Sequence, residues 1–195
     1  PYFDSNNDLQ GSTYIFVRDD QGNWTQQTRL FLEDGGVDDT FGESVGVDGN
    51  TALIADRLNN SVYVYISDGD DNWTQQAILT GDNIDYRLGF GEVVALDGDT
   101  TLVTGAYAEN GQVSVDVYVF TRDNAGNWSR QTKLTTDGAP EVDFDSFWPG
   151  ALALDGDTAM VGIDWDDALA TTSGSVYVYT RDGANNWSQQ TTLTA

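Results

Sequence analysis

Residues 90–135 read FGEVVALDGDTTLVTGAYAENGQVSVDVYVFTRDNAGNWSRQTKLT. The same text returns with small changes at residues 41–80 and 148–195, and a partial copy occupies residues 1–32. A period in the tens of residues is typical of one supersecondary unit stacked on its neighbours. The sequence therefore predicts a repeat protein with three full copies and one partial copy.

Each full copy is expected to form four short strands. In the copy quoted above these are residues 93–96, 101–104, 116–121 and 127–134. The first two are separated by Asp97-Gly98, a strong hairpin signal that we interpret as the central pair of a type I′ turn. The same dipeptide recurs in the other two full copies, so one antiparallel meander per copy is predicted.

Side-chain alternation indicates which strands are buried. In the third strand of the last copy, Val176 and Val178 point one way and Tyr177 and Tyr179 the other, so both faces are apolar. A strand with two apolar faces belongs to a sheet that is covered on both sides.

The fourth strand is more polar. In the partial copy Trp24 and Leu30 are predicted on one face, opposite Thr25, Gln27 and Arg29, which is the pattern of a half-buried edge strand. The first strands carry small residues where sheets would converge. Small inner, aromatic middle and polar outer strands together predict an all-β protein made of β-propeller blades of four antiparallel strands.

The copies resemble the FG-GAP repeat family, which is related to the β-propeller of integrin α subunits. The namesake pair is present as Phe41-Gly42 and Phe90-Gly91, while the last copy has Trp148-Pro149. The resemblance covers nearly the whole chain and implies a propeller for residues 1–195, as one domain or a segment of one. It says little about function, because one scaffold hosts many activities.

Integrin-like copies often carry a calcium loop in the hairpin between their first two strands. Here that place holds only tight turns at Asp48, Asp97 and Asp155. A turn of two or three residues cannot surround a cation that needs six to eight oxygen ligands. The family's calcium sites are therefore not expected in these hairpins.

The partial copy matches only the third and fourth strands of a blade, so residues 1–32 are expected to form a half blade. Blades follow at residues 41–80, 90–135 and 148–195. Two ways of closing a ring stay open. The remaining strands come either from the rest of a longer chain or from another molecule, including further copies of this chain.

The composition excludes several classes of function. Eight basic and 32 acidic residues leave a net charge of −24, which repels nucleic acid and anionic membranes. The chain has no cysteine and no histidine, which removes thiolate chemistry and the usual general base. No apolar run approaches the roughly twenty residues that span a bilayer. We expect no nucleic-acid partner, no membrane insertion and no catalysis.

Acidic loops are expected to gather on one face of the propeller. The densest carboxylates are Asp143 with Asp145, and Asp164 with Asp166 and Asp167. Carboxylates at such short spacing can bind Ca²⁺. A solvated acidic face, as in proteins adapted to high salt, is the competing interpretation, and the Asp-rich turns before each fourth strand are ordinary turn chemistry.

Five asparagines lie in N-x-S/T sequons and are candidate glycosylation sites: Asn23, Asn59, Asn72, Asn127 and Asn186. Four of them occupy the same repeat position, directly before a tryptophan. A structural cause is sufficient for these four, because asparagine suits a turn and tryptophan suits packing between blades.

These observations favour an extracellular or cell-surface binding or adhesion module that is not an enzyme. It would present its acidic loop face to a protein or glycan, with Ca²⁺ as the candidate cofactor. One alternative is a structural subunit of an extracellular filament or surface layer, completed by strand exchange between protomers. A second is a polysaccharide hydrolase that uses paired Asp residues.

Overall fold

The computed structural model describes residues 11–32, 40–81, 89–109, 112–135, 149–163 and 174–194. Within these residues the chain forms strands and turns, with no helix that could cross a membrane. The strands are β1 (Thr13–Arg18), β2 (Trp24–Leu30), β3 (Val45–Asp48), β4 (Thr51–Asp56), β5 (Ser61–Ser67), β6 (Trp73–Thr80), β7 (Phe90–Asp97), β8 (Thr100–Glu109), β9 (Gln112–Arg122), β10 (Trp128–Thr135), β11 (Pro149–Asp155), β12 (Thr158–Ile163), β13 (Ser175–Arg181) and β14 (Trp187–Thr194).

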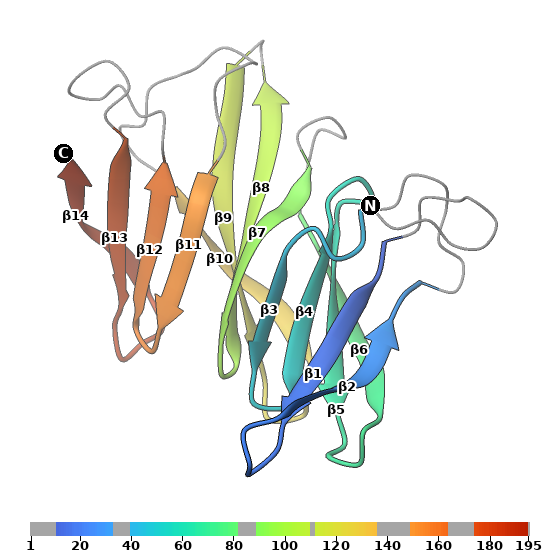
Figure 1. Cartoon of the computed structure of the whole chain (residues 1–195). Helices are drawn as coiled ribbons and strands as arrows, with labels where there is room; N and C mark the ends of the chain where they lie inside the picture. Colours follow the sequence, from blue (N-terminus) through green and yellow to red (C-terminus); the bar gives the residue numbers. More distant parts are fainter. Residues whose placement is uncertain are drawn as a thin grey trace.

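The strands form antiparallel meanders, as the repeats predicted. β1 and β2 make a two-stranded half blade, and β3–β6, β7–β10 and β11–β14 make three four-stranded sheets, here called blades 1, 2 and 3. Figure 1 shows the blades following one another in chain order. Strand β7, the first strand of blade 2, contacts β3 and β4 of blade 1 and β11 of blade 3. The predicted all-β propeller architecture of three blades and a half blade is confirmed.

The third strand of each blade packs on both sides. In β9, Val117 and Val119 belong to the apolar core shared with blade 3, while Tyr118 and Phe120 belong to the core shared with blade 1. All four are buried. Alternation along one strand therefore connects two interfaces, as the two apolar faces predicted.

The prediction that Trp24 and Leu30 share a face is wrong. Trp24 pairs with Arg18 and Leu30 pairs with Thr13, five residues apart on β1, so the two side chains lie on opposite faces. The cause is a β-bulge: the register shifts, and Gln27 has no partner across the strand pair. An extra residue in one strand reverses the alternation beyond it.

The hairpins lie where predicted, but their turn type differs from the prediction. Asp97 pairs with Thr100, so the central residues are Gly98 and Asp99 instead of Asp97 and Gly98. φ is +55° at Gly98 and is not positive at Asp99. A positive φ at the first central position alone is the pattern of a type II′ turn, in which glycine is required at that position.

The Phe-Gly pair connects successive blades. Phe90 is fully buried and meets Tyr118 edge to face, with ring centroids 5.3 Å apart. Gly91 has φ of +94°, and a Cβ there would lie 2.8 Å from Cγ2 of Val62 in blade 1. Only glycine satisfies both the left-handed backbone and this close approach.

Candidate functional site

The five predicted metal ligands, Asp143, Asp145, Asp164, Asp166 and Asp167, lie outside the described residues. Among the residues that the structure does describe, no group of three or more acidic side chains is arranged to hold a metal ion. The hairpin carboxylates have another role. Oδ2 of Asp48 accepts a hydrogen bond from the Gly98 amide at 2.7 Å, and Oδ2 of Asp97 accepts one from the Gly156 amide at 2.6 Å. These bonds connect the hairpins of neighbouring blades.

The five sequon asparagines are all exposed, and each uses its side-chain amide inside the fold. Nδ2 of Asn59 donates to Asp56 at 2.8 Å. Nδ2 of the other four donates to the aspartate four residues earlier, in the pairs Asn23–Asp19, Asn72–Asp68, Asn127–Asp123 and Asn186–Asp182. A glycosylated amide keeps one N–H, so these bonds are chemically compatible with a glycan.

The turns before the fourth strands are built around these aspartates. Oδ1 of Asp123 accepts the backbone amides of Asn127 and Ala125 at 2.8 and 2.9 Å. These bonds, that from the Asn127 amide first, lower the pKa of Asp123 below its ordinary 3.8. The geometry supports the turn interpretation of these Asp-rich segments, because their carboxylates are occupied by the chain's own donors.

Three charged side chains, Glu43, Arg57 and Glu92, lie near the two Phe-Gly pairs. Nε of Arg57 is 3.1 Å from Oε1 of Glu43. Glu92 stands at the corresponding position of the next blade, is partly buried, and its Oε2 has no hydrogen-bond partner. Burial raises the pKa of Glu92 to about 7, against the opposing effect of Arg57.

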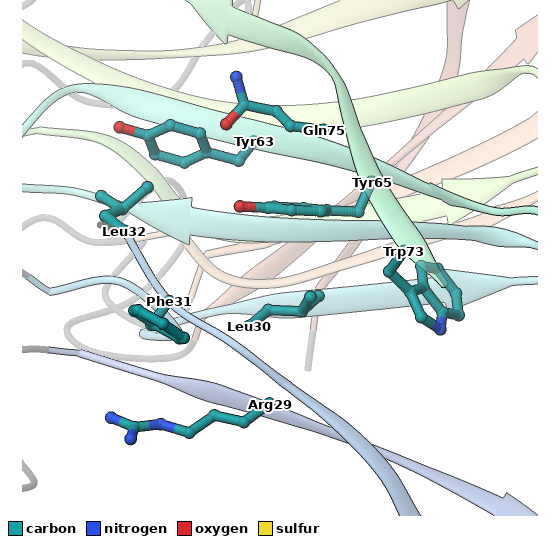
Figure 2. Close-up of a pocket in the computed structure, with 8 residues that line it drawn as sticks. All are labelled: Arg29, Leu30, Phe31, Leu32, Tyr63, Tyr65, Trp73 and Gln75. Atoms are coloured by element: carbon teal, nitrogen blue, oxygen red, sulfur yellow. The ribbon is translucent and has the colours of Figure 1, made fainter. Parts of the chain in front are cut away.

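A pocket of about 530 Å³ opens between the half blade and blade 1. In Figure 2, Tyr63 and Tyr65 project from β5 toward the end of β2, with Trp73 at one end of the pocket. Its lining residues are Arg29, Leu30, Phe31, Leu32, Tyr63, Tyr65, Trp73 and Gln75. Six of these eight residues are aromatic or aliphatic, and the polar groups are the guanidinium of Arg29, the amide of Gln75 and the hydroxyls of Tyr63 and Tyr65.

The aromatic wall is held in place by packing behind it. The ring of Phe41 meets Tyr63 and Tyr65 edge to face, with centroids 5.5 and 6.4 Å away. Nε1 of Trp73 donates to Oε1 of Gln27 at 2.9 Å, which fixes the indole. The guanidinium of Arg29 stands over Phe31 at 5.3 Å from the ring centroid. These contacts connect the pocket side chains to β2 and to the Phe41-Gly42 segment.

Sequence reasoning missed this pocket because its residues look like ordinary core positions. Tyr118 and Tyr177 occupy the position of Tyr63 in the later blades, and both are buried, whereas Tyr63 is partly exposed. One difference between the copies could have indicated the pocket. The half blade has the apolar pair Phe31-Leu32 where the next copy has Thr80-Gly81, and both Phe31 and Leu32 line the pocket.

A family model described as FG-GAP repeat matches residues 24–65 and 73–120. Each match covers one fourth strand and the first three strands of the next blade, so the sequence repeat is offset from the structural blade by one strand. The copy that carries Trp148-Pro149 is not among the matched residues. No curated protein matches this chain.

The structure of this chain is similar to the crystal structure of the Nup133 β-propeller domain of Vanderwaltozyma polyspora. The TM-score is 0.55 at 8% sequence identity, and the alignment covers 94% of this chain. It covers 57% of that domain, so the chain spans little more than half of the propeller that it matches. At this identity the likeness shows the fold alone.

Proposed function

This chain carries FG-GAP repeats on β-propeller blades, and from that premise we propose that it is a non-catalytic binding module whose aromatic pocket holds a glycan. The observation that carries the proposal is the pocket wall of Tyr63, Tyr65 and Trp73. Ligand sites typically combine apolar and aromatic walls with a few placed polar groups. Sugar rings suit such a wall, because they present C–H groups on their faces and hydroxyls at their edges.

The polar groups of the pocket match hydroxyl recognition. The amide of Gln75 both donates and accepts hydrogen bonds, and the guanidinium of Arg29 donates several. The net charge of −24 disfavours anionic glycans such as sulfated or uronic polymers. The proposed ligand is therefore a neutral oligosaccharide.

The test compares Tyr63→Ala with Leu58→Ala, a substitution of an exposed apolar residue that does not line the pocket. A panel of neutral oligosaccharides is titrated against each protein, with binding followed by calorimetry and by the indole NMR signals. We expect binding by the native chain and by Leu58→Ala, and loss of roughly tenfold or more in affinity for Tyr63→Ala. Equal affinity of both variants, or no binding to any sugar of the panel, would contradict the proposal that this pocket binds a glycan.

An extracellular location and calcium dependence belong to the same proposal. They are supported by the resemblance to integrin-like repeats and by the acidic loop residues Asp143, Asp145, Asp164, Asp166 and Asp167. If these carboxylates bind Ca²⁺, a chelator lowers the melting temperature and added Ca²⁺ restores it. An unchanged melting temperature with either reagent would remove calcium from the proposal without affecting the aromatic pocket.

A further inference from the structure

The tryptophan that begins each fourth strand has a different cross-strand neighbour in blade 1 than elsewhere. In the other three copies this neighbour is an arginine: Trp24 pairs with Arg18, Trp128 with Arg122 and Trp187 with Arg181. In blade 1 the tryptophan is Trp73, and its neighbour is Ser67. Trp73 lines the aromatic pocket. The pocket therefore lies at the copy in which serine stands in place of the arginine.

In blades 2 and 3 the arginine covers the indole. The guanidinium of Arg122 lies 5.3 Å from the ring centroid of Trp128, and that of Arg181 lies 5.2 Å from the ring centroid of Trp187. A guanidinium in this place is attracted by the negative face of the ring and occupies it. Ser67 is too short to reach over a ring, and its hydroxyl accepts a hydrogen bond from the Gly69 amide. Trp73 therefore lacks the cross-strand guanidinium that covers its counterparts.

Ser67 lies on the pocket side of blade 1. Tyr65 and Ser67 are two residues apart on β5, so their side chains project from the same face of the sheet. Their cross-strand partners on β6 are Gln75 and Trp73. Tyr65, Gln75 and Trp73 all line the pocket, and Figure 2 shows the indole at one end of it. An arginine at position 67 would project from the face that forms the pocket wall.

The indole nitrogens of Trp73 and Trp128 are bound by glutamines of the preceding copy. Nε1 of Trp73 donates to Oε1 of Gln27 at 2.9 Å, and Nε1 of Trp128 donates to Oε1 of Gln76 at 3.0 Å. Both glutamines are bulge residues without a cross-strand partner. Trp128 has this bond in addition to its arginine. In Trp73 the bond to Gln27 acts without an arginine over the ring.

Gln27 is itself held by a carboxylate of blade 1. Its Nε2 donates to Oδ1 of Asp71, in the turn before Trp73. An ionised carboxylate only accepts hydrogen bonds and an indole N–H only donates them. The carboxylate therefore fixes the amide nitrogen of Gln27 and leaves the amide oxygen for the indole. Asp71, Gln27 and Trp73 form one chain of hydrogen bonds, and its first bond is strengthened by the charge.

The backbone at Asp71 is strained. Its φ is +68°, in the left-handed region, where a side chain is disfavoured. The counterparts directly before the Asn-Trp pair are Gly22 and Gly126, with φ of +88° and +86°. Glycine adopts this conformation without steric cost. Strain of this kind at a position where other copies have glycine indicates a role for the side chain itself.

We propose that the indole of Trp73 is the surface on which a sugar ring of the ligand stacks, and that Asp71 is a positioning residue that holds this indole through Gln27. The inference rests on the proposed function of the pocket and assigns the C–H face of one neutral sugar ring to Trp73. Stacking needs a ring face that no cation of the chain occupies and an indole of fixed orientation. Ser67 provides the first, and the hydrogen bonds from Asp71 through Gln27 provide the second.

The experiment uses Asp71→Gly to separate positioning from a purely structural role. This variant removes the carboxylate and also relieves the left-handed strain, as glycine does in two other copies. Calorimetry measures its affinity for the neutral oligosaccharides, thermal unfolding gives its melting temperature, and NMR follows the indole N–H signal of Trp73. That signal is assigned by its absence from Trp73→Phe.

Asp71→Gly is expected to bind the sugar roughly fivefold more weakly. Its melting temperature should be unchanged or higher, and the indole N–H of Trp73 should shift and exchange faster with water. Asp71→Asn is the conservative rescue and should restore most of the lost affinity, because its Oδ1 accepts the same bond. Asn185→Gly is the matched control, since it relieves a φ of +65° at the same repeat position of blade 3. It should change neither the affinity nor the Trp73 signal.

A second variant tests the stacking surface by adding the missing cation. Ser67→Arg combined with Asn50→Asp copies blade 2, where Nε of Arg122 donates to Oδ1 of Asp99 at 2.6 Å. Asn50 and Asp99 hold the same repeat position, and their carbonyls accept the amides of Ser67 and Arg122. The double variant should fold and bind the sugar roughly tenfold or more weakly, because the guanidinium covers the indole.

Three results would overturn the inference. The first is native affinity in Asp71→Gly, and the second is weaker binding in Asp71→Gly with an unchanged indole signal and a lowered melting temperature, which indicates a structural role alone. The third is native affinity in a folded double variant. In each case the native chain still binds and Tyr63→Ala does not, so the pocket proposal stands. A native chain that binds no sugar contradicts the pocket proposal itself, and the stacking role with it.

Discussion

Glu43 and Glu92 occupy the same position in successive blades, directly after the Phe-Gly pair, but their carboxylates have different surroundings. Oε1 of Glu43 lies 3.1 Å from Nε of Arg57, whereas Oε2 of Glu92 is buried without a hydrogen-bond partner. Burial raises the pKa of Glu92 from an ordinary 4.5 to about 7. The folded chain therefore holds this proton more tightly than the unfolded chain does.

The sign of the pH dependence follows from linkage. Below its unfolded pKa of 4.5, a carboxyl whose pKa is raised by folding does not change the free energy of unfolding. As the pH rises from there toward about 7, this carboxyl lowers the free energy of unfolding more and more. Glu92→Gln should therefore raise the free energy of unfolding above pH 7 by about 1 kcal/mol, a value reduced because water screens a partly exposed side chain. Urea unfolding at several pH values measures this.

Glu43→Gln is the control, because it removes the carboxylate that is already paired with Arg57. It should not stabilise the chain at high pH. Glu92→Gln could instead raise the free energy of unfolding by the same amount at pH 4.5 as above pH 7. In that case a change in packing, and not the titration of Glu92, explains the effect.

Phe90→Ala should be among the most damaging single substitutions in the described residues. Its ring is fully buried between blades 1 and 2 and contacts Tyr118 and Phe120 edge to face. Truncating a buried phenylalanine costs about 3 to 5 kcal/mol, from lost transfer energy and the cavity left behind. The midpoint of urea unfolding measures the loss. Phe31→Ala, at an exposed position, should cost much less, and equal losses would show that the Phe-Gly ring is not a core residue.

Most of the fold was predictable because it follows from local patterns that the chain repeats. The Asp-Gly hairpins and the double alternation of Val176 to Tyr179 identify the strands and their burial. The face of Leu30 was not predictable, since a bulge at Gln27 depends on pairing across strands and leaves no mark in the period of the sequence. The turn type was missed because the register, and not the dipeptide, decides which residues are central.

The candidate site was less predictable than the fold. The carboxylates chosen from loop spacing lie outside the described residues, while the pocket uses tyrosines of the repeat core. Tyr63 and Tyr118 both stand in a Val-Tyr-Val stretch, yet Tyr118 is buried and Tyr63 is partly exposed. This difference arises from packing between blades, which a one-dimensional pattern does not contain.

Arg122→Ala should destabilise the chain, whereas Arg18→Ala at the same repeat position should not. Arg122 binds Asp99 through Nε at 2.6 Å, reaches Thr51 of the neighbouring blade and lies over Trp128. Its loss should cost about 1 to 2 kcal/mol, because the ion pair is partly exposed and the bond to Thr51 is partly buried. Urea unfolding measures the stability of both variants. Equal effects would show that the contact to the neighbouring blade contributes nothing.

Asp123→Ala should lower the melting temperature near neutral pH and have no effect in strong acid. The carboxylate accepts bonds from Asn127 and Ala125, and these hold its pKa below 3.8. A lowered pKa stabilises the fold above the unfolded pKa, and this stabilisation is lost as the pH falls through the folded pKa. Melting curves of native and variant chains should therefore converge at low pH. Asn124→Ala, in the same exposed turn, is the control. A gap between native chain and Asp123→Ala that persists unchanged in acid would mean that the carboxylate charge has no part in holding the turn.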